Sequence, residues 1–190
     1  MPLFEHLFGK AASENTFISD LNLIPENATP EGWEKICDVA VGGLTEVGFS
    51  RVSPLLMVIS SSGRGIFNSL TGEKCHRDYE EFFEGYHPAS LTCRGTGPLA
   101  DEVITIAGLC GGGLPAVNQY GESVECIAPE WPKEKIVYCP PGKTALIRKF
   151  QQGCCVIAKD YSFRAAGFSW DGSVLLVAVS SGLTLWRRKE

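Results

Sequence analysis

The chain has 190 residues, a formal net charge of −5 at pH 7 and 44% hydrophobic residues, which is typical of one packed domain. This acidic balance disfavours a surface built to neutralise nucleic-acid phosphates, and it equally disfavours docking on an anionic membrane. The 21 glycines and 11 prolines interrupt the chain so often that a mostly helical fold is excluded.

The N-terminal residues and the cysteines bear on the cellular compartment. Residues 1–10 include an acid and a histidine where a secretory signal would carry cations and then an unbroken apolar run. No apolar run approaches the roughly 20 residues that span a bilayer. We therefore expect a cytoplasmic, reducing location. The eight cysteines show no Cys-x-x-Cys spacing, so we expect free core thiols rather than a disulfide framework: Cys37, Cys75, Cys93, Cys110, Cys126, Cys139, Cys154 and Cys155.

The first third of the chain predicts an arm and then a helix. Residues 1–29 show no sustained period, which predicts a loosely attached arm with a short helical piece near residues 3–8. Residues 30–190 are expected to form a single β-rich domain. Within it, a helix is predicted over about residues 30–41, because Thr29 and Pro30 suit a helix start. The apolar residues recur at helical spacing: Trp33, Ile36, Cys37, Ala40 and Val41.

From Leu44 onward the sequence changes to short β-type runs separated by glycine, proline, aspartate and asparagine. Runs spaced about 8–12 residues apart, with turn signals between them, predict an antiparallel all-β assembly. The turns Asn68–Gly72 and Trp170–Gly172 are the clearest hairpin signals. The predicted strands are Val47–Ser50, Leu55–Ser60, Gly65–Asn68, Val103–Leu109, Ala116–Gln119, Val124–Ala128, Lys135–Cys139, Ala145–Phe150, Cys154–Ala158, Ala165–Ser169, Val174–Val179 and Thr184–Arg187.

Two segments resemble blades of a WD40-type β-propeller. Phe163–Arg188 has a strand that ends in Phe-Ser, an Asp-Gly turn, an apolar strand that ends in Ser-Ser, and a strand that closes on Trp. Leu55–Glu73 is similar to the middle strand, third strand and Thr-Gly-Glu turn of another blade. The resemblance implies a mainly β fold of antiparallel meanders in a small or incomplete β-propeller-like assembly, with a β-sandwich as the alternative. It also implies a binding role, because such proteins mostly bind partners.

The segment from His76 to His87 combines acids with four aromatic residues. Aromatic anchors surrounded by charge are typical of recognition sites, although Phe82 and Phe83 could equally pack onto the sheet. The preferred hypothesis is a non-catalytic protein-binding module, and a sharper form is an immunity-type inhibitor that presents acids to a basic toxin. The candidate partner-binding residues are Asp78, Tyr79, Glu80, Glu81, Phe83, Glu84 and Tyr86.

The alternative hypothesis is an enzyme or a small-ligand-binding domain with a pocket beside the glycine-rich segment Gly108–Pro115. That segment lacks the Gly-Lys-Ser/Thr of a phosphate loop and is followed by a β-type run, so a wide turn between strands is the simpler interpretation. The candidate ligand-binding residues of this alternative are Arg64, Arg94, Asp101, Gly111, Gly112 and Gly113.

Catalytic and metal-binding patterns are weak. Cys75, His76, His87 and Cys93 are the thiols and imidazoles closest in sequence, but their irregular spacing is not that of a zinc site. Neighbouring strand residues point to opposite faces, so Cys75 and His76 do not make a nucleophile–base pair. A Gly-x-Ser-x-Gly elbow is absent from the sequence. We therefore predict no catalytic residue, no metal site and no cofactor.

Overall fold

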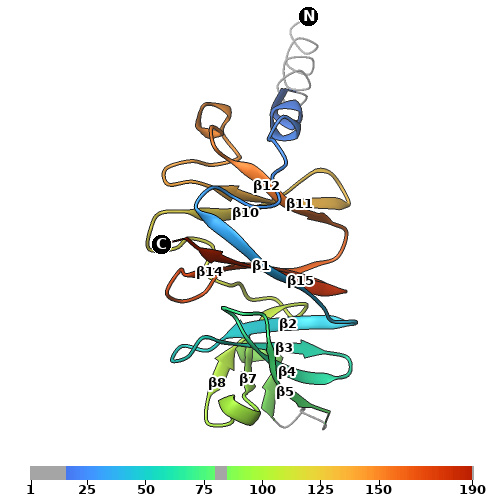
Figure 1. Ribbon diagram of the computed structural model, residues 1–190. Coiled ribbons are helices and arrows are strands. Elements are labelled where there is room, and N and C mark those ends of the chain that lie inside the picture. Colours follow the sequence, from blue (N-terminus) through green and yellow to red (C-terminus); the bar gives the residue numbers. More distant parts are fainter. Residues whose placement is uncertain (1–15, 80–84, 190) are drawn as a thin grey trace, which may run out of the picture.

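The computed structural model describes residues 16–79 and 85–189, which form a short helix and four small antiparallel sheets (Figure 1). The mainly β, antiparallel fold with one N-terminal helix is confirmed, but the described part of the helix covers residues 16–22 and not residues 30–41.

The four sheets stack in the following order. The first sheet contains β10 (Ser123–Glu130), β11 (Lys133–Cys139) and β12 (Cys155–Asp160). The second contains β1 (Trp33–Ala40), β15 (Gly182–Arg188), β14 (Val174–Val179) and β13 (Phe163–Phe168). The third contains β5 (Lys74–Asp78), β4 (Gly63–Asn68), β3 (Leu55–Ser60), β2 (Leu44–Phe49) and β9 (Ala107–Gly108). The fourth contains β6 (Tyr86–His87), β7 (Thr92–Arg94) and β8 (Val103–Thr105).

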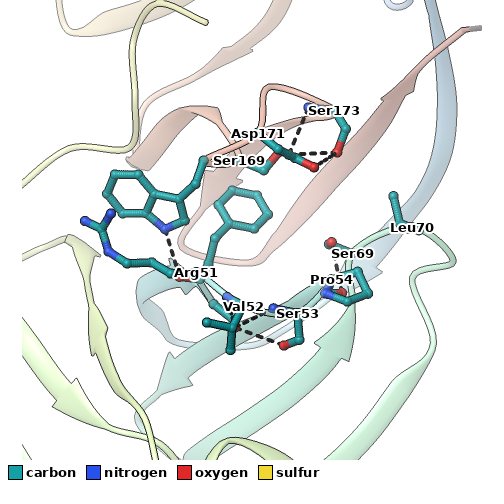
Figure 2. Close-up of a pocket in the computed structure, with 12 residues that line it drawn as sticks. Arg51, Val52, Ser53, Pro54, Ser69, Leu70, Ser169, Asp171 and Ser173 are labelled. Carbon is teal, nitrogen blue, oxygen red and sulfur yellow. Dashed lines mark hydrogen bonds between the residues drawn. The ribbon is translucent and has the colours of Figure 1, made fainter. Parts of the chain in front are cut away.

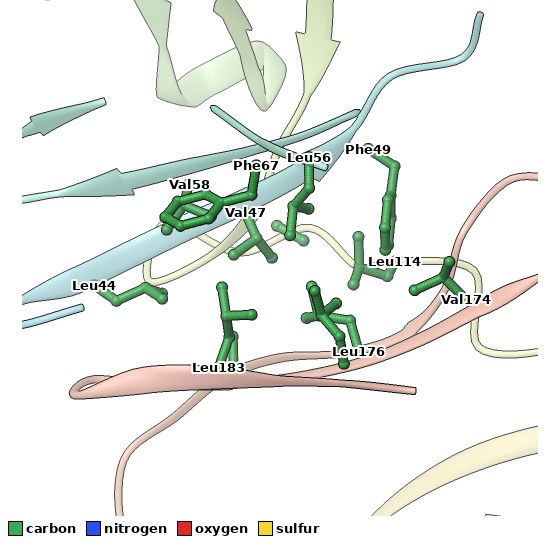
Figure 3. Packing of buried hydrophobic residues seen from close by; sticks show 13 residues of the cluster. Leu44, Val47, Phe49, Leu56, Val58, Phe67, Leu114, Val174, Leu176 and Leu183 are labelled. Carbon is green, nitrogen blue, oxygen red and sulfur yellow. The ribbon is translucent and has the colours of Figure 1, made fainter. Parts of the chain in front are cut away.

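The sheets lie face to face, and a separate hydrophobic cluster fills each interface. The cluster between the second and third sheets includes Leu176 and Leu183 on one side and Leu56 and Val58 on the other (Figure 3). A second cluster joins the first and second sheets, and a third joins the third and fourth sheets. The middle strands are therefore buried on both faces. This explains why β3 and β14 are unbroken apolar runs rather than alternating ones.

The second sheet joins two segments that are far apart in sequence, because β1 pairs with β15 from Trp33 opposite Arg188 to Ala40 opposite Gly182. The first and fourth sheets lie at opposite ends of the stack, so the described residues form an open stack and not a closed ring (Figure 1). The four layers also exceed the two of a simple sandwich. The likeness to WD40 repeats stays a prediction.

The helix predicted for residues 30–41 is wrong, because residues 33–40 form β1. The pairing of β1 with β15 shifts register between Lys35 and Cys37, so one extra residue is inserted there. Such a bulge changes which face the following residues take, and here it turned a strand pattern into helix-like spacing. Trp33 packs between the first and second sheets, whereas Ile36 and Cys37 pack toward the third.

The other predicted strands overlap observed ones where the strands are long and apolar. Val103–Leu109, predicted as one strand, is divided between β8 of the fourth sheet and β9 of the third. Ala116–Gln119 forms only an isolated bridge at Val117, and Ala145–Phe150 ends in the 3-10 turn η4 (Arg148–Phe150), so neither is a strand. Strands β1, β5, β6 and β7 were missed. Two more 3-10 turns, η2 (Pro88–Ser90) and η3 (Gly97–Leu99), flank β7.

Part of the predicted loose arm is docked on the first sheet. Leu21 and Ile24 are buried against Ile127 and Val137, and Asn27 donates a backbone hydrogen bond of 3.0 Å to Val156. The helical piece expected near residues 3–8 lies outside the described residues. In the described part of the chain, no helix has the length and apolarity needed to cross a membrane.

Candidate functional site

Three connections from the second and third sheets converge at one edge of the stack and enclose a hollow of about 320 Å³ (Figure 2). They are the β2–β3 loop, the β4–β5 turn and the β13–β14 turn. Because β2 and β13 belong to sheets that pack face to face, their ends are brought to the same edge. The Trp170 indole N–H donates a hydrogen bond of 3.1 Å to the Phe49 carbonyl, and this bond ties the two sheets together at the hollow.

Arg51 and Trp170 form the wall of this hollow. The guanidinium carbon of Arg51 lies 3.6 Å from the centroid of the Trp170 ring, which is a close cation–π stack. Trp170 is 40% exposed, so the stack lies at the surface. In the described part of the chain, Arg51 forms no hydrogen bond and no ion pair beyond this stack. The N–H groups of the Arg51 guanidinium therefore have no hydrogen-bond acceptor among the described residues.

The polar groups on the opposite wall are satisfied within their own turn. Asp171 accepts hydrogen bonds from the Ser169 hydroxyl at 2.6 Å, the Ser173 amide at 3.1 Å and the Ser173 hydroxyl at 2.8 Å. Partial burial tends to raise the pKa of Asp171, but these hydrogen bonds outweigh it and hold the pKa below the ordinary 3.8. The carboxylate is thus ionised at neutral pH and committed to the β13–β14 turn.

Ser50 organises the β2–β3 loop. Its buried hydroxyl donates to the Glu102 carboxylate at 2.9 Å, and it accepts from the amides of Val52 and Ser53 at 3.2 and 3.1 Å. The Ser53 hydroxyl also donates a hydrogen bond of 2.9 Å to the Ser50 hydroxyl oxygen. This network fixes the loop so that Val52, at 81% exposure, stands at the mouth of the hollow.

A second hollow of about 450 Å³ adjoins the first, because Leu70 and Ser173 line both. Its other lining residues are Tyr120 and the cationic end of β15, Arg187 to Lys189. The Arg188 guanidinium lies 3.9 Å from the Tyr120 ring centroid and pairs with the buried carboxylate of Glu122. We name the two hollows together the loop-edge groove.

The Arg188–Glu122 pair is built into the fold. Glu122 also accepts a hydrogen bond of 2.8 Å from the Tyr138 hydroxyl and one of 2.6 Å from the Asn118 amide. Arg187 pairs with Glu34 at 2.9 Å, and both side chains are about half exposed. Each end of the groove therefore presents an arginine stacked on an aromatic ring.

The acidic-aromatic segment is only partly described. Glu80, Glu81, Phe83 and Glu84 lie outside the described residues. Asp78 is buried, with 9% exposure, and pairs with Arg64. Its carboxylate is thus largely covered rather than presented to solvent. Tyr79 is 79% exposed, and the centroid of its ring lies 5.0 Å from the guanidinium carbon of Arg77.

Arg64, from the alternative hypothesis, and Asp78 and Tyr79, from the preferred one, line a single hollow of about 520 Å³. Arg64 also donates a hydrogen bond of 2.8 Å to the Arg94 carbonyl, which links β4 to β7. The sequence assigned these residues to two sites, and the structure brings them together at one sheet edge.

Tyr86 is not among the residues that line this hollow. Its hydroxyl donates to the buried Glu46 carboxylate at 3.0 Å and lies 2.9 Å from the Cys110 sulfur. Burial and these two contacts raise the pKa of Tyr86 far above its usual range. Tyr86 therefore ties the fourth sheet to the third rather than joining Tyr79 at a shared surface.

The glycine-rich segment forms an exposed turn. Gly108 and Gly111 exchange backbone hydrogen bonds of 2.9 and 3.0 Å, and Gly111 and Gly112 have φ of 104° and 78°, which glycine tolerates. Gly111, Gly112, Gly113 and Asp101 are exposed, and none of them lines a hollow described here. The ligand-binding role of these residues stays a prediction.

The thiols and imidazoles are dispersed. All eight cysteines are free, but Cys75, Cys110 and Cys126 are exposed, so the expectation of core thiols holds only for some of them. Cys93 is fully buried, whereas Cys75 is at the surface and His76 lies 3.4 Å from the Thr96 hydroxyl. Among the described residues, no three His, Cys, Asp or Glu side chains gather as metal ligands.

The groove residues Arg51, Trp170, Tyr120 and Arg188 were missed by sequence reasoning. The sequence predicts the Trp170–Gly172 turn, but it assigns no binding role to the aromatic ring at the start of that turn. Comparison with protein-family models, curated proteins and solved structures finds no match to this chain. The functional argument therefore depends on the geometry alone.

Proposed function

We propose that this chain is a non-catalytic protein-binding module that holds a segment of another protein in the loop-edge groove. The observation that carries the proposal is the Arg51–Trp170 stack, whose guanidinium has no polar partner among the described residues. Arginine and tryptophan are enriched among the residues that dominate binding energy at protein interfaces. A stacked arginine is also already ordered, so it loses little side-chain freedom when a partner binds.

The apolar lining supports a protein partner. Val52, Leu70, Tyr120 and Trp170 expose 81%, 39%, 45% and 40% of their surface along the groove. Single exposed apolar residues are ordinary, but four along one groove, next to stacked arginines, resemble a recognition surface. The two adjoining hollows suit an extended segment that places one side chain in each.

The chemistry of the lining favours binding over catalysis. The hydroxyls of Ser50, Ser169 and Ser173 all donate to carboxylates of the protein itself. Among the described residues, Asp171 is the single carboxylate that lines the groove, and hydrogen bonds from its own turn stabilise its charged form. A general base needs a lone pair directed at the substrate, and these groups direct theirs at their own turn.

The test is site-specific photo-crosslinking in cell extract. The photoreactive residue p-benzoylphenylalanine at Leu70, which lines both hollows, should capture a defined partner. At Tyr161, which is 67% exposed at the other end of β13, it should not capture that partner. Trp170→Ala should abolish the product at Leu70. If both positions give the same products, or if Trp170→Ala leaves them unchanged, the groove is not the binding site.

We also propose, as a second candidate function, that the chain inhibits a basic toxin. In this proposal the acidic-aromatic segment from His76 to His87 binds the toxin. The exposed Tyr79, which directly follows β5, supports it, since an exposed ring that acids follow in the sequence suits an interface anchor. We also propose a cytoplasmic location, which the eight free thiols support.

A further inference from the structure

We propose that the loop-edge groove selects a partner segment in which an apolar side chain is flanked by carboxylates, that is, an acidic-apolar extended peptide. This inference rests on the proposed function and names the chemistry of the partner. Three features of the groove carry it: an uncompensated arginine, a cationic far end, and an apolar strip between them.

Arg51 is the uncompensated cation. Its flat face is covered by Trp170 at 3.6 Å, so the N–H groups at the guanidinium edge are what a ligand meets. The planar guanidinium matches a carboxylate with two parallel hydrogen bonds, and such charge-assisted bonds are stronger than neutral ones. The serine hydroxyls of the same hollow already donate to internal acceptors. A ligand acceptor in this hollow therefore finds Arg51 as its main side-chain donor.

The far end of the groove is also cationic. Arg187 and Arg188 pair with Glu34 and Glu122, while Lys189 has no ion pair among the described residues. The whole chain carries a net charge of −5, whereas the described lining of the groove holds four cationic side chains, Arg51, Arg187, Arg188 and Lys189, and one carboxylate, Asp171. The groove is a local exception, and complementary charge directs an acidic partner to it.

The apolar strip lies between the two cationic ends. Leu70 lines both hollows, and Val52 and Pro54 line the first beside Arg51. When an apolar side chain of the partner peptide packs on Leu70, the residues before and after it in the peptide are directed toward Arg51 on one side and Lys189 on the other. This spacing favours acid–apolar–acid segments over uniformly acidic ones.

The test uses fluorescein-labelled peptides and fluorescence anisotropy with the full chain. The probe is Gly-Glu-Glu-Leu-Glu-Glu-Gly, compared with versions in which lysine replaces every glutamate or serine replaces the leucine. The acidic leucine peptide should bind at least about tenfold more tightly than either comparison peptide, and its affinity should fall as salt rises. If the lysine peptide or the serine peptide binds as well, the inference is overturned.

Two variants locate the binding. Arg51→Glu should weaken the acidic leucine peptide by about tenfold or more, because it replaces attraction with repulsion. Lys149→Glu makes the same change of charge on the exposed η4 turn beside the first sheet, and it should leave the affinity unchanged. Circular dichroism checks that both variants fold. Equal losses in the two variants would mean that only net charge matters, which contradicts a specific groove.

Two further outcomes separate the inference from the proposed function. If inorganic phosphate at matched ionic strength displaces the peptide, the groove is a simple anion site and the peptide inference fails. If the crosslinked partner at Leu70 presents a neutral or basic segment, the selectivity for acids is wrong while the binding function stands.

Discussion

Leu175 and Leu176 are neighbours on β14 and both are fully buried, yet they pack in different hydrophobic clusters. Leu175 faces the first sheet together with Trp186 and Phe168, and Leu176 faces the third sheet, whose Leu56 belongs to the same cluster. Since successive strand residues point to opposite faces, one strand serves two cores.

This relationship predicts that Leu175→Ala and Leu176→Ala are both strongly destabilising. Each should lower the free energy of unfolding by about 2–5 kcal/mol, because each leaves a cavity in a fully packed interface. Urea unfolding of the two single variants and the wild type measures the change. A loss below about 1 kcal/mol for either variant would show that its interface is not a close-packed core.

The long apolar strands could be predicted from sequence because burial on both faces leaves an unmistakable run, as in β3 and β14. Strand β1 could not, because its bulge at Ile36 gives a helical spacing that only pairing with β15 overrules. The loop-edge groove could not be predicted from the sequence for a different reason. Arg51 and Trp170 are far apart in sequence, and they meet only because the second and third sheets stack.

The predicted acidic site shows the same limit. Asp78 looked like one of several exposed acids, but its position at the end of β5 places it opposite Arg64 on β4. A strand register, which sequence spacing alone does not supply, decides whether an acid is exposed or paired.

Alkaline pH should destabilise the protein through Tyr138. Burial, and secondarily the hydrogen bond to Glu122, raise the pKa of Tyr138 above the ordinary 10.0. The neutral phenol is therefore favoured in the folded state, so its contribution is fully present below the unfolded pKa near 10 and is lost as pH rises toward the folded pKa. Tyr138→Phe should flatten the fall of melting temperature above about pH 10 relative to wild type. Tyr161→Phe, at an exposed position, serves as the control; equal flattening in both variants would exclude Tyr138 as the cause.

Trp170→Ala should separate stability from binding. The side chain is 40% exposed and makes one hydrogen bond, to Phe49, so its loss should cost less than about 2 kcal/mol of unfolding free energy. Binding of the acidic leucine peptide should fall much more, because Arg51 loses the ring that orders it. A melting temperature reduced as far as that of Leu175→Ala would instead make Trp170 part of the core.

The basic-toxin proposal has its own variant. Replacing Glu80, Glu81 and Glu84 together by lysine should abolish salt-sensitive association with a cationic protein, since attraction becomes repulsion. The same triple variant should still bind the acidic leucine peptide at the groove. Unaltered affinity for the cationic protein would remove this second proposal.

The most direct measurement of the groove as a binding site is the indole N–H region of a ¹H–¹⁵N NMR spectrum. The chain has four tryptophans, and two of them are exposed: Trp170 in the groove and Trp131, at 78% exposure, beside the first sheet. Titration with the acidic leucine peptide should shift the Trp170 indole signal progressively to saturation and leave that of Trp131 in place. A shift of the Trp131 signal alone, or of neither at saturating peptide, would contradict the account.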